Sequence, residues 1–311
     1  MVEDNQIKAQ ISPFAIREGE IKTFDGKDGY VSMNQIVHKI NIGHINEIHF
    51  AILELVNEFE FITSRQLYQM LEIKGIDPKS QDKLNNKLEQ LVKSKILTRY
   101  YFNSDEGKGI YRIYCLEKMG KYLLNSKEVE CKWQPSDNTK PVPMIKKRLA
   151  GNQTLIAYLR KVKAFDSYIV KPAITAKVTG KVFKASGGSV KLTKNKKSIQ
   201  FLFEVIRREQ EWEKKLVEKM RLYKDFYENF VAGDSGFSTM PQLILIYEDE
   251  KHMALAFKEI VKNQVEIPQI KLYFTTDLRQ NKETLEDTLV EFKLVDGKYK
   301  MEDIELKLLG M

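Results

Sequence analysis

The chain has 311 residues, of which 42% are hydrophobic and 30% charged, and its formal net charge is +8. It holds no apolar run near the roughly 20 residues that cross a bilayer, and its N-terminus lacks the basic and apolar regions of a secretory signal. Its two cysteines and four histidines show no metal-ligand spacing. We therefore expect a cytoplasmic protein with no membrane partner, no metal and no other cofactor.

The first segment, residues 1–43, is expected to form an N-terminal arm or a small hairpin. Its stretch FDGKDGYVS sets two glycine-containing turns between short apolar pieces.

Residues 44–126 then follow a different pattern. In INEIHFAILELVNEFEF, apolar residues recur every three or four positions, which predicts a helix with one buried stripe. A second helix is expected in TSRQLYQML, and a third should bury Leu84, Leu88 and Leu91. Two strand-like runs, ILTRYYF and IYRIYCL, flank the polar loop NSDEGKG. This order of three helices and a hairpin predicts a winged helix-turn-helix domain.

The next segment, residues 127–147, contains three of the eight prolines and little periodicity, and it is interpreted as a linker. Residues 148–311 then alternate helical and strand-like patterns in the order α-β-β-β-α-β-α-β. Such an order predicts a mixed sheet flanked by helices. The fold class expected for the whole chain is therefore α+β, with a winged helix-turn-helix followed by an α/β domain.

The positive charge is concentrated in the middle of the chain. Residues 1–135 have no net charge, residues 136–230 have a net charge of +13, and residues 231–311 have a net charge of −5. A concentrated basic region attracts polyanions, so we expect double-stranded DNA as the partner. The lysines that would contact DNA in this region are Lys177, Lys181, Lys184, Lys191, Lys194, Lys196 and Lys197, with Lys171 just before them. Gly187 and Gly188 are expected at the tip of a hairpin that projects these lysines.

Further DNA contacts are expected from the winged helix-turn-helix. In this motif the second helix of the helix-turn-helix enters the major groove and the hairpin touches the backbone. Lysine can bind phosphate or guanine, and Asn and Gln can pair with adenine. The expected contacts are Lys79, Lys83, Asn86, Lys87 and Gln90 on the helix, with Arg99 and Lys108 on the wing.

Three segments of the chain resemble the replication-relaxation family of bacterial plasmids and mobile elements. They are YRIYCLEKMGKYLL, FLFEVIRREQEWEKKLVEKMRLYKDFY and PQLILIY, which is followed by a helical pattern. The resemblance implies a winged helix joined to a degenerate nuclease-like domain of the PD-(D/E)XK type, similar to the restriction-endonuclease core. It also implies a strand that ends in an acid and leads into a helix with a Lys and a Tyr, which here would be Glu204, Lys219 and Tyr223.

The residues needed for nuclease chemistry are incomplete in this sequence. A metal-dependent nuclease needs two or more oxygen ligands for Mg²⁺ and a base or cation near the attacking water. The expected second strand, GGSVKLTKNKKS, has no carboxylate, and Ile206 occupies the position of the nuclease lysine after Glu204. We therefore expect no enzyme activity, with Glu204 as the catalytic candidate only if the chain is a nuclease.

The resulting hypothesis is a DNA-binding accessory or regulatory protein of a plasmid or mobile element. It would act in replication, relaxation or conjugative transfer, together with plasmid replication or transfer proteins. A homodimer is also expected, because winged helices often bind palindromic sites. Two alternatives stay open: a divergent metal-dependent DNA nuclease, and a protein-interaction adaptor that does not bind DNA.

Overall fold

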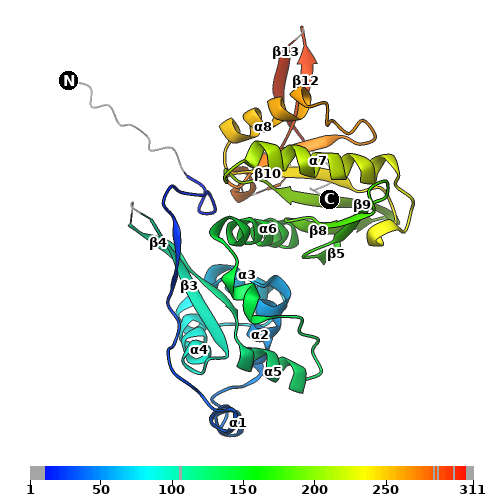
Figure 1. The fold of residues 1–311 in the computed structure, drawn as a ribbon. Helices are drawn as coiled ribbons and strands as arrows, with labels where there is room; N and C mark the ends of the chain where they lie inside the picture. The colour runs from blue at the N-terminus through cyan, green and yellow to red at the C-terminus, as the bar shows by residue number, and fades with distance from the viewer. Residues whose placement is uncertain (1–10, 105–106, 283, 286, 297, 306–311) are drawn as a thin grey trace, which may run out of the picture.

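The computed structural model describes residues 11–104, 107–282, 284–285, 287–296 and 298–305. This part of the chain forms two lobes stacked on each other (Figure 1). It contains eight α-helices and both parallel and antiparallel strand pairs, which confirms the predicted α+β class. None of its helices combines the length and the apolar character that a membrane crossing would need.

The N-terminal lobe is built from helices around a four-stranded sheet of order β1-β3-β4-β2. Its elements are β1 (Ile21–Phe24), α1 (Met33–Asn41), α2 (Glu47–Phe59), β2 (Ile62–Thr63), α3 (Ser64–Ile73), α4 (Gln81–Lys93), β3 (Leu97–Ser104), β4 (Gly107–Leu116) and α5 (Lys118–Ser126). Thr63 and Ser80 cap α3 and α4 through their side chains. Leu84, Leu88 and Leu91 are fully buried, which confirms the predicted leucine seam.

The N-terminal segment differs from a self-contained hairpin. Strand β1 pairs antiparallel with β3, a neighbour far along the chain, and α1 follows it. The strand therefore extends the sheet of the N-terminal lobe. Residues 1–10 of the predicted arm lie outside the described residues.

The C-terminal lobe contains a seven-stranded mixed sheet of order β13-β12-β11-β10-β9-β8-β5 and a separate β6-β7 hairpin. Its elements are α6 (Val142–Lys161), β5 (Phe165–Ile169), β6 (Ala173–Ala176), β7 (Lys181–Lys184), β8 (Gly188–Lys194), β9 (Lys197–Val205), α7 (Trp212–Glu228), β10 (Gln242–Tyr247), α8 (Glu250–Lys262), β11 (Leu272–Thr276), β12 (Leu289–Val295) and β13 (Lys298–Ile304). Strands β9, β10 and β11 are parallel, and the outer strands run antiparallel to them.

Three details of this lobe differ from the sequence expectations. Helix α6 begins at Val142, inside the predicted linker 127–147, because Pro141 and Pro143 are compatible with a helix start. Five strands, rather than three, precede α7. The expected hairpin tip is also wrong. Gly187 and Gly188 are buried at the start of β8, against Phe203 and Leu155.

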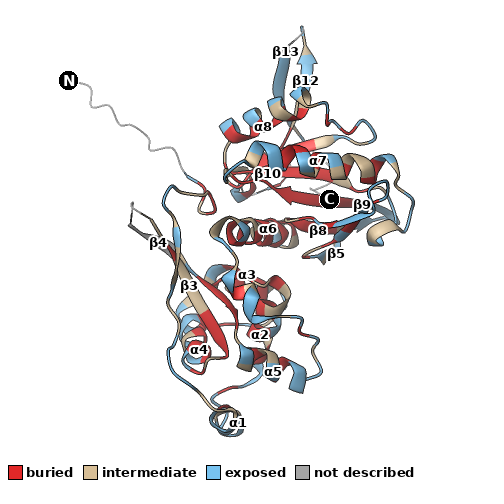
Figure 2. Cartoon of the chain, in the orientation of Figure 1, coloured by how far each residue is buried: buried red, intermediate tan, exposed pale blue. Residues whose placement is uncertain are grey.

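Helix α6 joins the two lobes into one body. The buried apolar residues of the N-terminal lobe continue through α6 to one face of the large sheet. Helices α7 and α8 cover the opposite face, over a second apolar cluster. The buried residues in Figure 2 accordingly follow the sheet and both helix layers. The large sheet therefore has an α6 face, toward the N-terminal lobe, and an α7 face, away from it.

Candidate nucleic-acid interface

A cleft of about 1810 Å³ lies between the lobes. Side chains of α3, α4 and the β3-β4 hairpin line it from the N-terminal lobe, and side chains of α6 line it from the C-terminal lobe. Helix α3 also packs on α6: the Gln66 side-chain amide donates to the Leu149 carbonyl at 2.7 Å. The cleft therefore has a fixed wall on each side.

Helix α4 presents a polar stripe to this cleft. Gln81, Asn85, Asn86 and Glu89 line it, while the leucines on the opposite side of the helix are buried. The Gln81 amide donates to Asn85 at 3.2 Å, which orders the first turn of the stripe. Carboxamides in this arrangement can donate to and accept from base edges, in particular those of adenine.

The acidic side chains that line the cleft are neutralised by arginines. Glu89 and Asp25 both pair with Arg99. Asp25 also pairs with Arg112, at 2.6 Å. Glu72 lies 3.8 Å from Arg160 on α6. The charge left for a ligand is therefore modest and positive.

Arg65 on α3 is the cation of the cleft that is most available to a ligand. Its side chain is exposed, lines the cleft, and forms no ion pair within the described part of the chain. Lys161 on α6 lines the other wall and donates to the carbonyls of Gln280 and Lys282. Both cations can turn toward a phosphate, because carbonyl contacts leave the lysine charge uncompensated.

Some of the predicted contacts of the winged helix line the cleft, and others do not. Asn86 and Arg99 line the cleft. Lys79, Lys83, Lys87 and Gln90 do not line it, and Gln90 instead lies 3.1 Å from the ring of His49. The side chain of Lys108 lies outside the described residues.

The predicted lysines of the C-terminal lobe separate into two groups. Lys177, Lys181 and Lys184 lie on the β6-β7 hairpin, whose apolar residues pack on the α7 face. Lys191 lies within β8, and Lys194, Lys196 and Lys197 lie at the β8-β9 turn that follows. Lys171 belongs to neither group, because it pairs with Glu60 of the N-terminal lobe.

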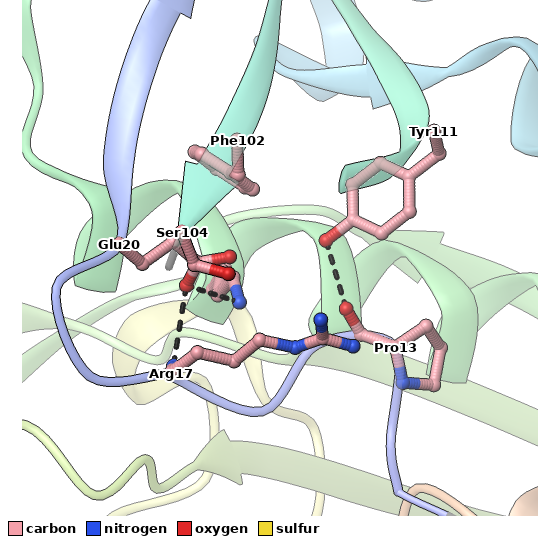
Figure 3. Close-up of a pocket in the computed structure, with 7 residues that line it drawn as sticks. Pro13, Arg17, Glu20, Phe102, Ser104 and Tyr111 are labelled. Atoms are coloured by element: carbon pink, nitrogen blue, oxygen red, sulfur yellow. Dashed lines mark hydrogen bonds and ion pairs between the residues drawn. The ribbon is translucent and has the colours of Figure 1, made fainter. Parts of the chain in front are cut away.

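An N-terminal strap, residues 11–20, connects the hairpin with the C-terminal lobe. Figure 3 shows the Tyr111 hydroxyl of β4 directed at the Pro13 carbonyl, 2.9 Å away. On the other side, the Ser12 hydroxyl donates to Asp277 and the Ile16 amide donates to Glu248. The strap therefore ties the wing-like hairpin to the strand ends of the large sheet.

The strand ends beneath the strap hold a buried ion pair. Arg207 follows β9, Asp277 follows β11, and their side chains form two contacts, of 2.8 and 2.9 Å. Burial raises the pKa of Asp277, and the adjacent Arg207 offsets part of this rise. With Ser12 as a further donor to the carboxylate, the pair is a structural junction between the strap and the sheet.

Glu204 lies on the α7 face of the sheet, where its carboxylate is surrounded by donors from the chain. Tyr223 donates to it at 2.6 Å and the Ser186 hydroxyl at 2.7 Å. Lys219 lies 3.6 Å away. The structure therefore brings together the three residues Glu204, Lys219 and Tyr223. The described residues contain no cluster of three His, Cys, Asp or Glu side chains suited to a metal ion.

Sequence reasoning missed Arg65, Asn85, Arg112 and Arg160 as residues of the interface. The polar stripe of α4 was visible in the sequence, because Gln81, Asn85 and Glu89 are spaced by four residues. The contribution of α6 had no such signal, since it depends on how the two lobes stack.

Comparison with known families gives one match. The profile of the replication-relaxation family matches residues 53–239, more than half of the chain. Neither the curated proteins nor the solved structures gave a significant match. The matched segment includes α3, α4, the β3-β4 hairpin, α6, Glu204 and α7. The chain therefore belongs to the replication-relaxation family.

Proposed function

We propose that this protein binds double-stranded DNA in the cleft between its lobes, as a non-enzymatic accessory factor in the replication or relaxation of a plasmid or mobile element. The observation that carries the proposal is the amide stripe of α4, which faces open space beside Arg65 and Arg112. Amides suit base edges and arginines suit phosphates or guanine. The family supports the biological context.

The topology of the N-terminal lobe supports a winged helix-turn-helix over residues 44–126. Helices α3 and α4 are joined by a short turn, and β2 and β3 both pair antiparallel with β4. In a winged helix, α4 would be the recognition helix and β3-β4 the wing. These two elements, together with α3, form the wall of the cleft that belongs to the N-terminal lobe, and such a domain would meet DNA there.

The surroundings of Glu204 support a structural role over a nuclease. Both carboxylate oxygens accept hydrogen bonds from Ser186 or Tyr223, and the residue is buried. A metal would have to displace these donors, and β8 offers no carboxylate as a second ligand. We expect supercoiled plasmid to stay intact with the protein and Mg²⁺ or Mn²⁺. Cleavage that disappears in Glu204→Ala would establish the nuclease alternative.

The binding proposal is tested by the fluorescence anisotropy of a labelled duplex at low and moderate salt. We expect binding that weakens as salt rises, because phosphate contacts release counterions. Arg65→Glu should weaken it about tenfold or more, as expected when a phosphate or guanine contact is reversed. A single-stranded oligonucleotide is the competitor that tests the preference for duplex. No binding at low salt would favour the adaptor alternative.

The double variant Lys83→Glu/Lys87→Glu separates the cleft from the outer side of α4. Both lysines are on α4, and neither lines the cleft. If DNA lies in the cleft, this variant should bind more tightly than Arg65→Glu. The reverse order would place DNA on the outer side, as the sequence alone predicts. A homodimer remains a prediction, which sedimentation with and without duplex would test.

A further inference from the structure

We propose that DNA leaving the cleft runs along α6 onto a second contact surface, the lysine patch, formed by Lys163, Lys194, Lys196 and Lys197. The inference rests on the proposed function and extends it, because it defines where the nucleic acid goes beyond α4. It also assigns different roles to the two groups of lysines in the C-terminal lobe.

The cleft follows one side of α6. The lining residues Ala150, Gln153, Ala157, Arg160 and Lys161 are spaced as one helical stripe. From Ala150 to Arg160 the stripe extends about 15 Å, at 1.5 Å per residue. It ends in two basic residues at the C-terminus of the helix. A polyanion lying along the cleft would therefore meet positive charge at that end.

The lysine patch begins just after this end. Lys163 lies two residues beyond Lys161. The Thr193 amide donates to the Ala164 carbonyl at 2.8 Å, which brings the end of β8 beside Lys163. Lys194 pairs in register with Lys197 across the β8-β9 turn. The cleft and the lysine patch are thus connected through a few residues of the chain.

The turn between β8 and β9 presents the lysines to solvent. Asn195 and Lys196 both have positive φ, 49° and 65°, as the primed two-residue turns of β-hairpins require. All four lysines of the patch are exposed, and none forms an ion pair with another described residue. The nearby Asp166 is already paired with Lys191 at 3.2 Å. The patch therefore retains its charge.

This arrangement gives the cleft and the lysine patch different roles in binding DNA. The cleft has polar groups suited to bases, but arginines neutralise its acidic side chains and leave little excess charge. The patch, in contrast, consists of four exposed lysines, which carry positive charge and no groups that read base edges selectively. Phosphate contacts supply most of the salt-dependent affinity for DNA. The patch is thus the stronger candidate for this part of the binding.

Lys181 and Lys184 are predicted not to take part. Their hairpin packs on the α7 face through Phe183 and Ala185, on the side of the sheet opposite to α6. Lys214 and Arg221, on α7, are exposed on the same face. These four residues form a control group with the same total charge as the lysine patch.

The experiment compares two variants in which four cations become Gln, using a labelled duplex of about 24 base pairs, roughly 80 Å at 3.4 Å per pair. The patch variant carries Lys163→Gln, Lys194→Gln, Lys196→Gln and Lys197→Gln. The control variant carries Lys181→Gln, Lys184→Gln, Lys214→Gln and Arg221→Gln. Anisotropy is measured over a salt series for both variants and for the wild type.

We expect the patch variant to bind at least about tenfold more weakly at low salt, with a salt slope shallower by about 3 to 4, since each lost phosphate contact contributes about 0.9. The control variant should match the wild type within about twofold, because its cations lie off the proposed path. Equal losses of affinity in both variants would show that net charge alone causes the effect, and this result would overturn the inference. Unchanged binding of the patch variant would overturn it too, while leaving binding in the cleft intact. Absence of wild-type binding would instead overturn the proposed function.

Discussion

The two sides of the large sheet differ in whether their polar groups are hydrogen-bonded within the protein or open to a ligand. On the α7 face, Glu204 accepts from Tyr223 and Ser186 and is buried. On the other side of the sheet, beyond α6, the amides of Asn85 and Asn86 and the guanidinium of Arg65 line the cleft from the N-terminal lobe. The carboxylate of Glu204 is thus engaged in hydrogen bonds within the fold, while the polar groups that line the cleft lie between the lobes. Buried polar groups whose hydrogen bonds are made within the protein indicate a structural role. Polar groups that line a cleft indicate where a ligand can bind.

Among the variants that test this contrast, Glu204→Ala is expected to have the largest effect, which is on stability. The change leaves the buried hydroxyl of Tyr223 without its acceptor and removes one of the two acceptors of the part-buried Ser186 hydroxyl. We therefore expect a loss of about 3 kcal/mol in the free energy of unfolding. DNA affinity should stay within about twofold of wild type. Urea denaturation and anisotropy measure the two quantities.

Glu204→Gln is the matched control, because it keeps one acceptor oxygen and should cost less stability. A Glu204→Ala protein with wild-type stability and lost activity on DNA would contradict the structural role.

A second prediction concerns His252, which is buried beside Trp212 and Tyr247 on the α7 face. Burial lowers the pKa of His252 to about 3, and the charges of Arg208 and Arg207 act in the same direction. Below about pH 6.5 the unfolded chain takes up a proton that the folded chain does not, so stability falls as pH falls. At pH 5 the expected loss from this residue is about 2 kcal/mol.

His252→Phe keeps an aromatic ring and removes this proton uptake. Urea denaturation at pH 7 and pH 5 should therefore show a smaller acid sensitivity in the variant than in the wild type. Equal acid sensitivity in the two proteins would refute the assignment of this proton uptake to His252.

The smallest expected effect is on sequence discrimination. If Asn85 and Asn86 read base edges, their joint replacement by Ala should reduce the preference for a selected site over random duplex about tenfold. This corresponds to about 1.4 kcal/mol, or one amide-base contact at the lower end of the usual range. Binding-site selection supplies the site, and anisotropy with both duplexes measures the preference. Gln90→Ala is the control on the same helix, because Gln90 is engaged with His49. An unchanged preference in the Asn variant would remove α4 from base recognition.

The sequence predicted local structure well where periodicity decides it. The leucine seam of α4 and the strand that ends near Glu204 were both expected, and the structure confirms them. The resemblance also correctly indicated the family.

The sequence could not predict features that depend on tertiary placement. Gly187 and Gly188 resembled a turn, but they allow β8 to pack closely on Phe203. The stacking of α6 against α3 decides which side of α4 faces the cleft, and no local pattern encodes it. For the same reason, eight lysines that are neighbours in the sequence are distributed over three places in the fold.

The most direct test of the central claim is photocrosslinking of the protein to duplex DNA with halogenated bases, followed by mass spectrometry of the crosslinked peptides. We expect crosslinks within α3, α4 and the β3-β4 hairpin and along α6, with phosphate-side contacts extending to residues 194–197. Crosslinks confined to α7, α8 and the β6-β7 hairpin would rule out binding in the cleft, because they would place DNA on the face that holds Glu204.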